Sequence, residues 1–259
     1  SSSAHARSSR CFRYVLCPAR SRSGIHGSEP RIPDRDRAGH STYLKQRLDR
    51  AWAEEQQHRH AEAVVHMERH GAYIEFVGAP GFDLMVQSLE AMGSKIRLLN
   101  VRTEGEGDLQ HTLATVYVPH NKRGHFLRKI QAYATQTVKG SDKPKNASLV
   151  NSISDIHLAV LESFWRSDER SLIPGDTPEW VEAWLSGDHN DKVAAFERLL
   201  RDLHVESAEG LLRFPERSVK LILAHRRQLE QVIEACDDIA EFRLARETAN
   251  FYVELENRE

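Results

Sequence analysis

The sequence predicts an α+β fold built around an antiparallel sheet. Stretches in which polar and apolar residues alternate, typical of half-buried strands, recur along the chain. Stretches with apolar residues three to four apart, typical of helices, lie between them. Over residues 72–135 the order is β-α-β-β-α, one strand short of a ferredoxin-like β-α-β-β-α-β sandwich. We therefore expect such a sandwich, preceded by an amphipathic helix and followed by a second, smaller β-α-β unit.

Composition is consistent with a globular protein of the cytoplasm. The chain has 259 residues, a formal net charge of -2 and 40% hydrophobic residues, enough for a core. This charge gives no general attraction to nucleic acids or anionic membranes. No run of 18 apolar residues indicates a membrane span, so no membrane partner is expected. The three cysteines form no CxxC pair, which favours a reducing compartment over a disulfide framework.

The first residues differ in composition from the rest. Residues 1–28 contain five Arg and no acidic residue, a composition shared by organelle transit peptides and basic RNA-binding tails. Such a segment cannot bury enough apolar surface to fold alone. We therefore expect residues 1–40 to be a disordered basic leader.

Residues 41–71 have the pattern of an amphipathic helix. Ser41 or Thr42 is the expected N-cap, because a hydroxyl accepts a bond from a free backbone N–H at the helix start. One side of the helix is apolar and consists of Tyr43, Leu44, Leu48, Ala51 and Trp52.

Residues 72–165 are expected to form the ferredoxin-like domain. The expected elements are a strand at 72–78, a helix at 82–92, strands at 95–102 and 111–119, and a helix at 123–135. A short helix is expected in NASLVNSI.

The last strand of this domain is ambiguous in the sequence. In residues 155–165, Ile156, Leu158 and Val160 alternate like a strand, whereas Ile156, Val160 and Phe164 also have helical spacing. A closing strand is favoured, because without it the sheet lacks an edge partner.

The remaining residues are expected to form a linker with helices and a small unit. Residues 166–203 include a helix that starts at Pro178 and a second helix at 191–203. Residues 204–259 are expected to form a small α/β unit: a strand at 216–224, a helix at 225–238, and strands at 239–245 and 250–256.

No metal or cofactor is expected from the sequence. The chain has 14 histidines, but HExxH is absent, and so are the phosphate-binding patterns GxGxxG and GxxxxGK[ST]. His66 and His70 would share a helix face, whereas His58 and His60 would not. We interpret these histidines as solvated surface residues.

No catalytic residue is predicted either. The chain has no GxSxG motif. His157, Glu162 and Ser163 supply the residue types of a triad, but they are too close on one element to converge. We expect the chain alone to lack peptidase activity.

Aromatic residues do not predict a binding site. Trp165, Trp180 and Trp184 cluster after the first domain and are interpreted as core packing, or as packing of the linker onto a neighbouring domain. A ferredoxin-like sheet that binds RNA needs exposed aromatics on its strands, and TLATVYV offers one aromatic residue and no Gly. Nucleic acid is therefore not favoured as a partner.

Several segments together resemble one family. In order they are YIEFVGAPGFDLMVQSLE, IRLLNVR, ATVYVPHNKRGHFLRKIQAY, KPKNASLVNSISDIHLAVLESFW and FRLARETANFYVEL. This ordered set, over residues 41–259, is similar to the N-terminal region of large bacterial subtilisin-like serine proteases (subtilases), of the kind encoded beside an AAA-type ATPase.

The resemblance implies that this chain precedes a protease domain. The aspartate, histidine and serine motifs of that domain, DTG or DSG, HGT and GTS, are not in this sequence, so no catalytic residue can be assigned. A non-catalytic prosegment-like region would act as intramolecular chaperone, inhibitor or regulatory domain for the downstream protease domain. The AAA-type ATPase is a second implied partner. The alternative is a free-standing ferredoxin-like module that binds nucleic acid or protein.

Overall fold

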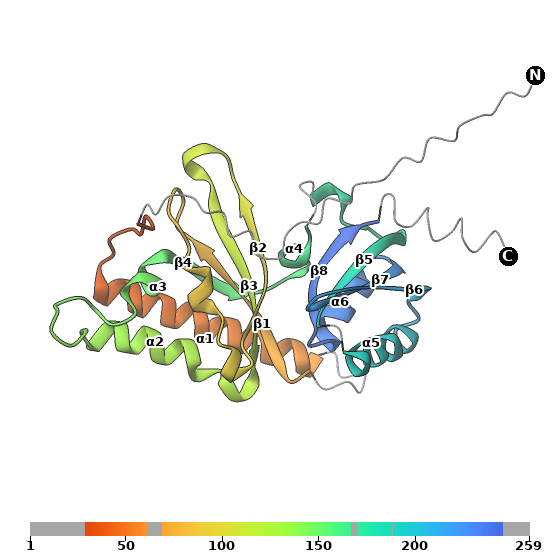
Figure 1. Cartoon of the computed structure of the whole chain (residues 1–259), viewed down its shortest axis with the longest axis horizontal. Helices are drawn as coiled ribbons and strands as arrows, with labels where there is room; N and C mark the ends of the chain where they lie inside the picture. Colours follow the sequence, from red (N-terminus) through yellow and green to blue (C-terminus); the bar gives the residue numbers. More distant parts are fainter. Residues whose placement is uncertain (1–28, 62–68, 167–169, 188, 246–259) are drawn as a thin grey trace, which may run out of the picture. The chain divides into compact units, whose positions relative to one another are not determined.

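The fold is α+β, with two four-stranded antiparallel sheets and an N-terminal helix (Figure 1). The computed structural model describes residues 29–61, 69–166, 170–187 and 189–245. Ser1–Pro30 and Arg31–Glu259 are separate units, and all elements described below belong to the second. No helix of the described residues is long and apolar enough to cross a membrane.

The first sheet has the strand order β2-β3-β1-β4, with antiparallel pairing throughout. Its strands are β1 (Gly71–Gly78), β2 (Arg97–Glu104), β3 (His111–Pro119) and β4 (Ile153–Leu158). The expectation of a four-stranded antiparallel sheet within residues 72–165 is confirmed. The ambiguous segment is the closing strand β4, and the short α4 (Leu161–Phe164) follows it.

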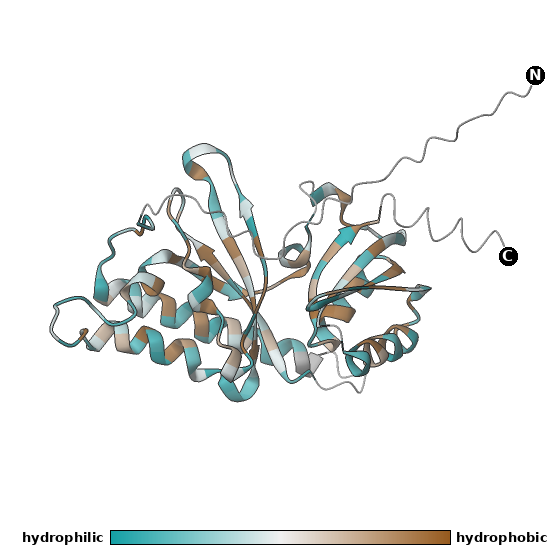
Figure 2. Ribbon diagram, in the orientation of Figure 1, coloured by the Kyte–Doolittle hydropathy of each residue, from teal (hydrophilic) through white to brown (hydrophobic). Residues whose placement is uncertain are grey.

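Two helices, α1 (Arg37–Ala61) and α2 (Gly124–Thr135), pack on one face of this sheet. Figure 2 shows apolar residues on the helix sides that face the strands. The helix residues of this core are Leu44, Leu48, Ala51, Trp52, Phe126, Ile130 and Tyr133. Tyr43, expected on the apolar side of α1, is instead 42% exposed.

The start of α1 corrects the sequence prediction. The N-cap is Asp36, whose Oδ2 accepts a hydrogen bond of 2.7 Å from the backbone N–H of Gly39. The hydroxyls of Ser41 and Thr42 lie inside the helix and donate to the carbonyl of Ala38. The helix therefore includes residues 37–40, which were expected in the disordered leader.

The helix expected at residues 82–92 is absent. The segment forms two 3₁₀ turns, η1 (Val86–Leu89) and η2 (Met92–Ser94). The physical reason is that α1 packs beside α2 on the same sheet face and takes the place of this helix. The short helix expected in NASLVNSI is present as α3 (Ala147–Ser152). Further 3₁₀ turns are η3 (Gly107–Leu109), η4 (His120–Lys122) and η5 (Arg170–Leu172).

The second sheet has the strand order β6-β7-β5-β8 and is also antiparallel. Its strands are β5 (Glu179–Ser186), β6 (Glu206–Phe214), β7 (Arg217–Ala224) and β8 (Ile239–Leu244). Two helices, α5 (Asn190–Asp202) and α6 (Arg226–Ala235), contribute Phe196, Leu199, Leu229 and Val232 to the core on one side of the sheet.

This second sheet differs from the predicted small β-α-β unit. The prediction of a helix that starts at Pro178 is wrong, because residues 179–186 form the strand β5. The strand β6 was not predicted. The sheet therefore has four strands, and it begins before residue 204. The strand expected at 250–256 lies outside the described residues.

The two sheet units share a buried junction centred on Tyr73 of β1. This side chain is 1% exposed, and its hydroxyl donates to the Cys236 carbonyl (2.5 Å) and accepts from the Ile239 N–H (3.1 Å). Its ring meets Phe164 edge to face at 4.9 Å. The turn between α6 and β8 is thereby held against the first sheet.

Polar contacts from β2 extend this junction. Nη1 of Arg97 donates to Oδ1 of Asp238 (2.6 Å), and the guanidinium lies 4.4 Å from the Tyr117 ring centroid. Nδ2 of Asn100 donates to the Ala240 carbonyl (2.8 Å). Nζ of Lys192, on α5, reaches the same Asp238 oxygen at 2.6 Å.

The tyrosine hydroxyl can be removed without changing the packing. In Tyr73→Phe the Cys236 carbonyl and the Ile239 N–H are left buried without this partner, so the free energy of unfolding should fall by about 1–3 kcal/mol. Equilibrium unfolding in urea measures this change in the free energy of unfolding. The control is Tyr43→Phe, which removes a hydroxyl that meets Asp155 on a 42% exposed tyrosine and should cost less, at most about 1 kcal/mol. Equal effects would contradict a role for Tyr73 in the junction.

The same turn predicts an unreactive thiol. Burial raises the pKa of Cys236 to about 12. Because the thiolate is the reactive species, the peptide containing Cys236 should remain unmodified by iodoacetamide at pH 8 in the folded protein. In urea the same peptide should be modified within minutes, which peptide mass mapping detects. Rapid modification without denaturant would show that the junction opens readily.

Candidate functional site

The histidines do not form a metal site in the described part of the chain. No group of three or more His, Cys, Asp or Glu is arranged to hold an ion there. Nδ1 of His70 lies 3.0 Å from an Asp237 oxygen, and that of His58 lies 4.0 Å from Glu234. His66 lies outside the described residues, and the side chain of His60 is not described.

His157, Glu162 and Ser163 have separate partners. Nε2 of His157 lies 3.4 Å from Oε2 of Glu75. The carboxylate of Glu162 pairs with Arg226, and Ser163 is 1% exposed with its Oγ accepting from the Val160 N–H. These contacts leave none of the three arranged as nucleophile, base and orienting acid.

The partner of His157 is the buried carboxylate of β1. Glu75 is 2% exposed, forms an ion pair with Arg102 of β2, and accepts from the Thr115 hydroxyl at 3.4 Å. Burial opposes the charge of Arg102, but its hydrogen bonds to Glu75 and Glu104 outweigh burial and raise its pKa. Both charges have partners, so we interpret this cluster as structural.

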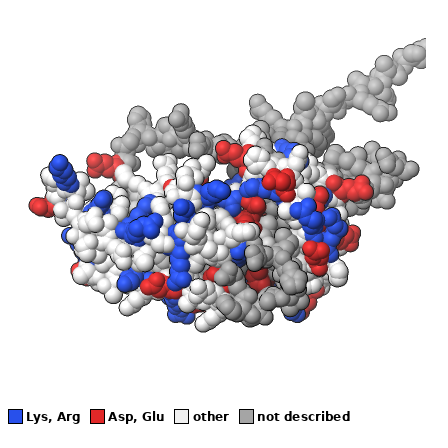
Figure 3. Space-filling view, turned by 90° about the horizontal axis from the view of Figure 1, so that it is seen from below, with Lys and Arg blue, Asp and Glu red and all other residues white. Residues whose placement is uncertain are grey.

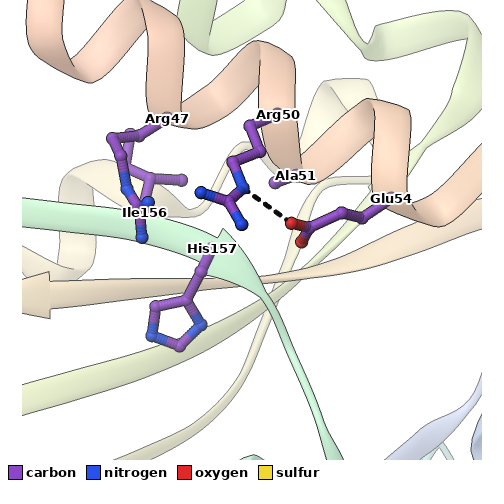
Figure 4. A pocket seen from close by; sticks show the side chains of 6 residues that line it. All are labelled: Arg47, Arg50, Ala51, Glu54, Ile156 and His157. Atoms are coloured by element: carbon purple, nitrogen blue, oxygen red, sulfur yellow. Dashed lines mark hydrogen bonds and ion pairs between the residues drawn. The ribbon is translucent and has the colours of Figure 1, made fainter.

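A shallow hollow of about 100 Å³ lies between α1 and β4 (Figure 4). Arg47 and Arg50 face it, and His157 lines it from the strand. Arg47 makes a bidentate pair with Asp155 (2.5 and 2.9 Å), and Arg50 pairs with Glu54 at 2.8 Å. Because these arginines already have carboxylate partners, the hollow has no excess charge with which to hold an anion.

The second sheet presents aromatic residues on the face away from its helices. Along β5 the buried residues Val181, Ala183 and Leu185 alternate with half-buried Trp180 and Trp184. The tryptophans were expected on a helix, but as strand residues they share the outer face of the sheet. We call this outer face the aromatic face; its members are Trp180, Trp184, Leu212, Phe214 and Leu223.

Trp184 is stacked on both sides. The Phe214 ring lies parallel to it with centroids 5.5 Å apart, and the Arg243 guanidinium lies 4.1 Å from its ring centroid. Phe214 comes from β6 and Arg243 from β8, which lie on opposite sides of β5 in the sheet. Both faces of the indole are thus covered, and its edge, with Nε1 bonded to Glu182 at 3.0 Å, remains for contact.

The chain leaves β8 beside this face. The backbone N–H of Ala245 donates to the Trp180 carbonyl at 3.0 Å. Its side chain packs near Ala208 and Leu221 with Trp180. Whatever follows Ala245 therefore begins next to the aromatic face.

Sequence reasoning missed the residues that complete this face. Leu212 and Phe214 belong to β6, a strand that was not predicted, and Arg243 was read only as part of a strand. The alternation of Leu212 and Phe214 with Arg213 was the available signal. Trp165 is 3% exposed in the core, which confirms its interpretation as a packing residue, whereas Trp180 and Trp184 lie half-buried on the outer face.

Comparisons with known proteins do not identify the chain. Neither the comparison with protein families nor that with curated proteins finds a match. Among solved structures, an unknown protein from Galdieria sulphuraria matches with a TM-score of 0.24 and 12% identity. The match covers 64% of this chain and 88% of that one.

The buried carboxylate gives a prediction for stability. Glu75→Ala leaves the Arg102 guanidinium without its buried partner and should lower the free energy of unfolding by about 3–5 kcal/mol. Glu54→Ala removes the exposed partner of Arg50 and should cost at most about 1 kcal/mol. Thermal and urea unfolding of both variants measure the difference. A Glu75→Ala variant as stable as Glu54→Ala would show that the buried pair is not structural.

Proposed function

We propose that this chain is the non-catalytic N-terminal region of a subtilisin-like serine endopeptidase and binds the downstream protease domain. The carrying observation is the aromatic face, which lies where the chain leaves β8 at Ala245. A domain that follows in the same polypeptide would be held close to this face at high effective concentration. The ordered resemblance to subtilase N-terminal regions gives the class of that domain.

The proposal includes the finer fold. Each sheet unit is a ferredoxin-like sandwich, in which the first and third strands are central, as the orders β2-β3-β1-β4 and β6-β7-β5-β8 suggest. In the first unit α1 substitutes for the helix between the first two strands. The unit built on the first sheet, β1–β4, would be the prosegment-like part. The whole region would act in the cytoplasm as intramolecular chaperone, inhibitor or regulatory domain. The AAA-type ATPase remains a second proposed partner.

Protein is favoured over nucleic acid as the partner of the aromatic face. Bases stack on open ring faces, and single-stranded nucleic acid needs such rings. Both faces of Trp184 are already occupied by Phe214 and Arg243. A surface of aromatic edges and aliphatic side chains with polar neighbours is instead typical of protein interfaces.

The test is binding to the protease domain encoded after this region, with its catalytic serine changed to alanine. We expect isothermal titration calorimetry to give a Kd of about 1 μM or lower between the separate proteins, typical of a specific interface. Leu212→Glu puts a charge into the aromatic face and should weaken binding at least about tenfold, since an unpaired buried charge is costly. The control is Leu109→Glu, a leucine that is 74% exposed elsewhere.

Three outcomes would contradict the proposal. The first is a coding sequence after Glu259 without an in-frame subtilase domain. The second is a protease domain that does not bind, or that binds equally well to both variants. The third is labelling of a serine in this chain by a fluorophosphonate, which would mean that the chain itself has a nucleophile.

A further inference from the structure

A second surface, on the first sheet unit, has an excess of positive charge. Between Pro119 and Ser141 the sequence has five Lys or Arg residues and neither Asp nor Glu, although the whole chain has a net charge of -2. This segment comprises the turn before α2 and the helix itself. Figure 3 shows Lys and Arg side chains gathering on the half of the surface that contains α2. We call Lys122, Arg123 and Arg128 the basic patch.

The three cations of the basic patch come from the turn η4 and the first part of α2. The Arg123 guanidinium is held 5.6 Å from the ring centroid of Trp52 on α1. The side chain of Arg128 folds back over Gly124, the first residue of α2. A Cβ atom added to Gly124 would lie 3.1 Å from Nη1 of Arg128. Lys122 immediately precedes Arg123 in the turn. None of the three makes an ion pair with another residue of the described ranges.

The surroundings of His125, in the first turn of α2, show the same excess of positive charge. Burial lowers the pKa of His125, and Lys129, Arg128 and Lys122 lower it further. No carboxylate opposes these effects. Nε2 of His125 is buried without a hydrogen-bond partner. The positive potential around His125 is therefore not neutralised within the described protein.

Helix stability does not explain this arrangement. Cations near the start of a helix are unfavourable, because the helix dipole is positive there. The first turn of α2 has no acidic residue and no side-chain cap. The sequence thus accepts a local cost, which is typical of positions kept for function.

From this charge arrangement we infer that the basic patch binds an acidic segment of another protein. Carboxylates would pair with the two guanidiniums and the ammonium group, with Arg favouring bidentate contacts. A single-stranded nucleic acid is a poorer fit, because the aromatic residues of α2, Phe126 and Tyr133, are 2% and 1% exposed and offer no ring for stacking. The inference does not depend on the downstream protease domain.

The test uses a synthetic twelve-residue peptide of alternating Glu and Ser, with a Gln-Ser peptide of equal length as control. Fluorescence anisotropy with the full chain at low salt should show saturable binding of the acidic peptide only. The triple variant Lys122→Gln, Arg123→Gln, Arg128→Gln should weaken binding by about tenfold or more, because contacts between charged groups dominate. Rising salt should weaken binding further, as expected for exposed charges.

The matched control variant removes three positive charges from a different part of the surface. Arg198→Gln, Arg201→Gln, Arg227→Gln changes three exposed arginines on α5 and α6, and binding should change less than about twofold if the site is local. Equal losses in the two triple variants would overturn the inference, since net charge alone would then explain binding. So would tighter binding of a twelve-nucleotide single strand than of the acidic peptide. Absence of saturable peptide binding would also overturn it.

Discussion

The hydroxyl of Tyr73 joins the two halves of the structure. It satisfies a carbonyl and an N–H of the α6–β8 turn, both of which would otherwise be buried without this partner. The ring of Tyr73 lies on the face of the first sheet opposite α1 and α2, and there it packs into the core of the second sheet. Because β8 follows directly from this turn, Tyr73 helps to fix the position of the second sheet's edge strand, together with Asn100 of β2, whose side chain donates to the Ala240 carbonyl.

The sequence predicted the parts of the fold in which one periodicity is dominant. The strands β1, β3 and β7 alternate or are continuously apolar, and α2, α5 and α6 have apolar residues three to four apart, so their type was correct. The closing strand β4 was predicted from a requirement of the sheet and not from its own pattern. Of the aromatic face only Trp180 and Trp184 were noticed, and on the wrong element.

The wrong secondary-structure predictions have physical causes, most of which lie in contacts between segments and not in the sequence of one segment. The segment at 82–92 has helical spacing, but α1 occupies the sheet face on which that helix would pack. The residues of β5 are apolar on both faces, so Trp180 and Trp184, four apart, imitate a helix. The strand β6 mixes polar and apolar residues, and its pairing with β7 shifts between Ser207 and Leu211, which interrupts the alternation. The cap at Asp36 was missed because the leader was judged by composition.

The position of α1 on the sheet has a consequence for how the chain is synthesised. This helix precedes every strand, yet it packs most extensively against β4, and Arg47 pairs with Asp155 108 residues later. During translation α1 therefore leaves the ribosome long before its main partner exists. The apolar side of α1 can meet α2 and the earlier strands first, but its contacts with β4 form only when the closing strand emerges. The core of the first sheet is thus complete only after β4 has been made, and a ribosome that stalls before residue 158 would hold a chain whose earliest helix has no strand β4 to cover it.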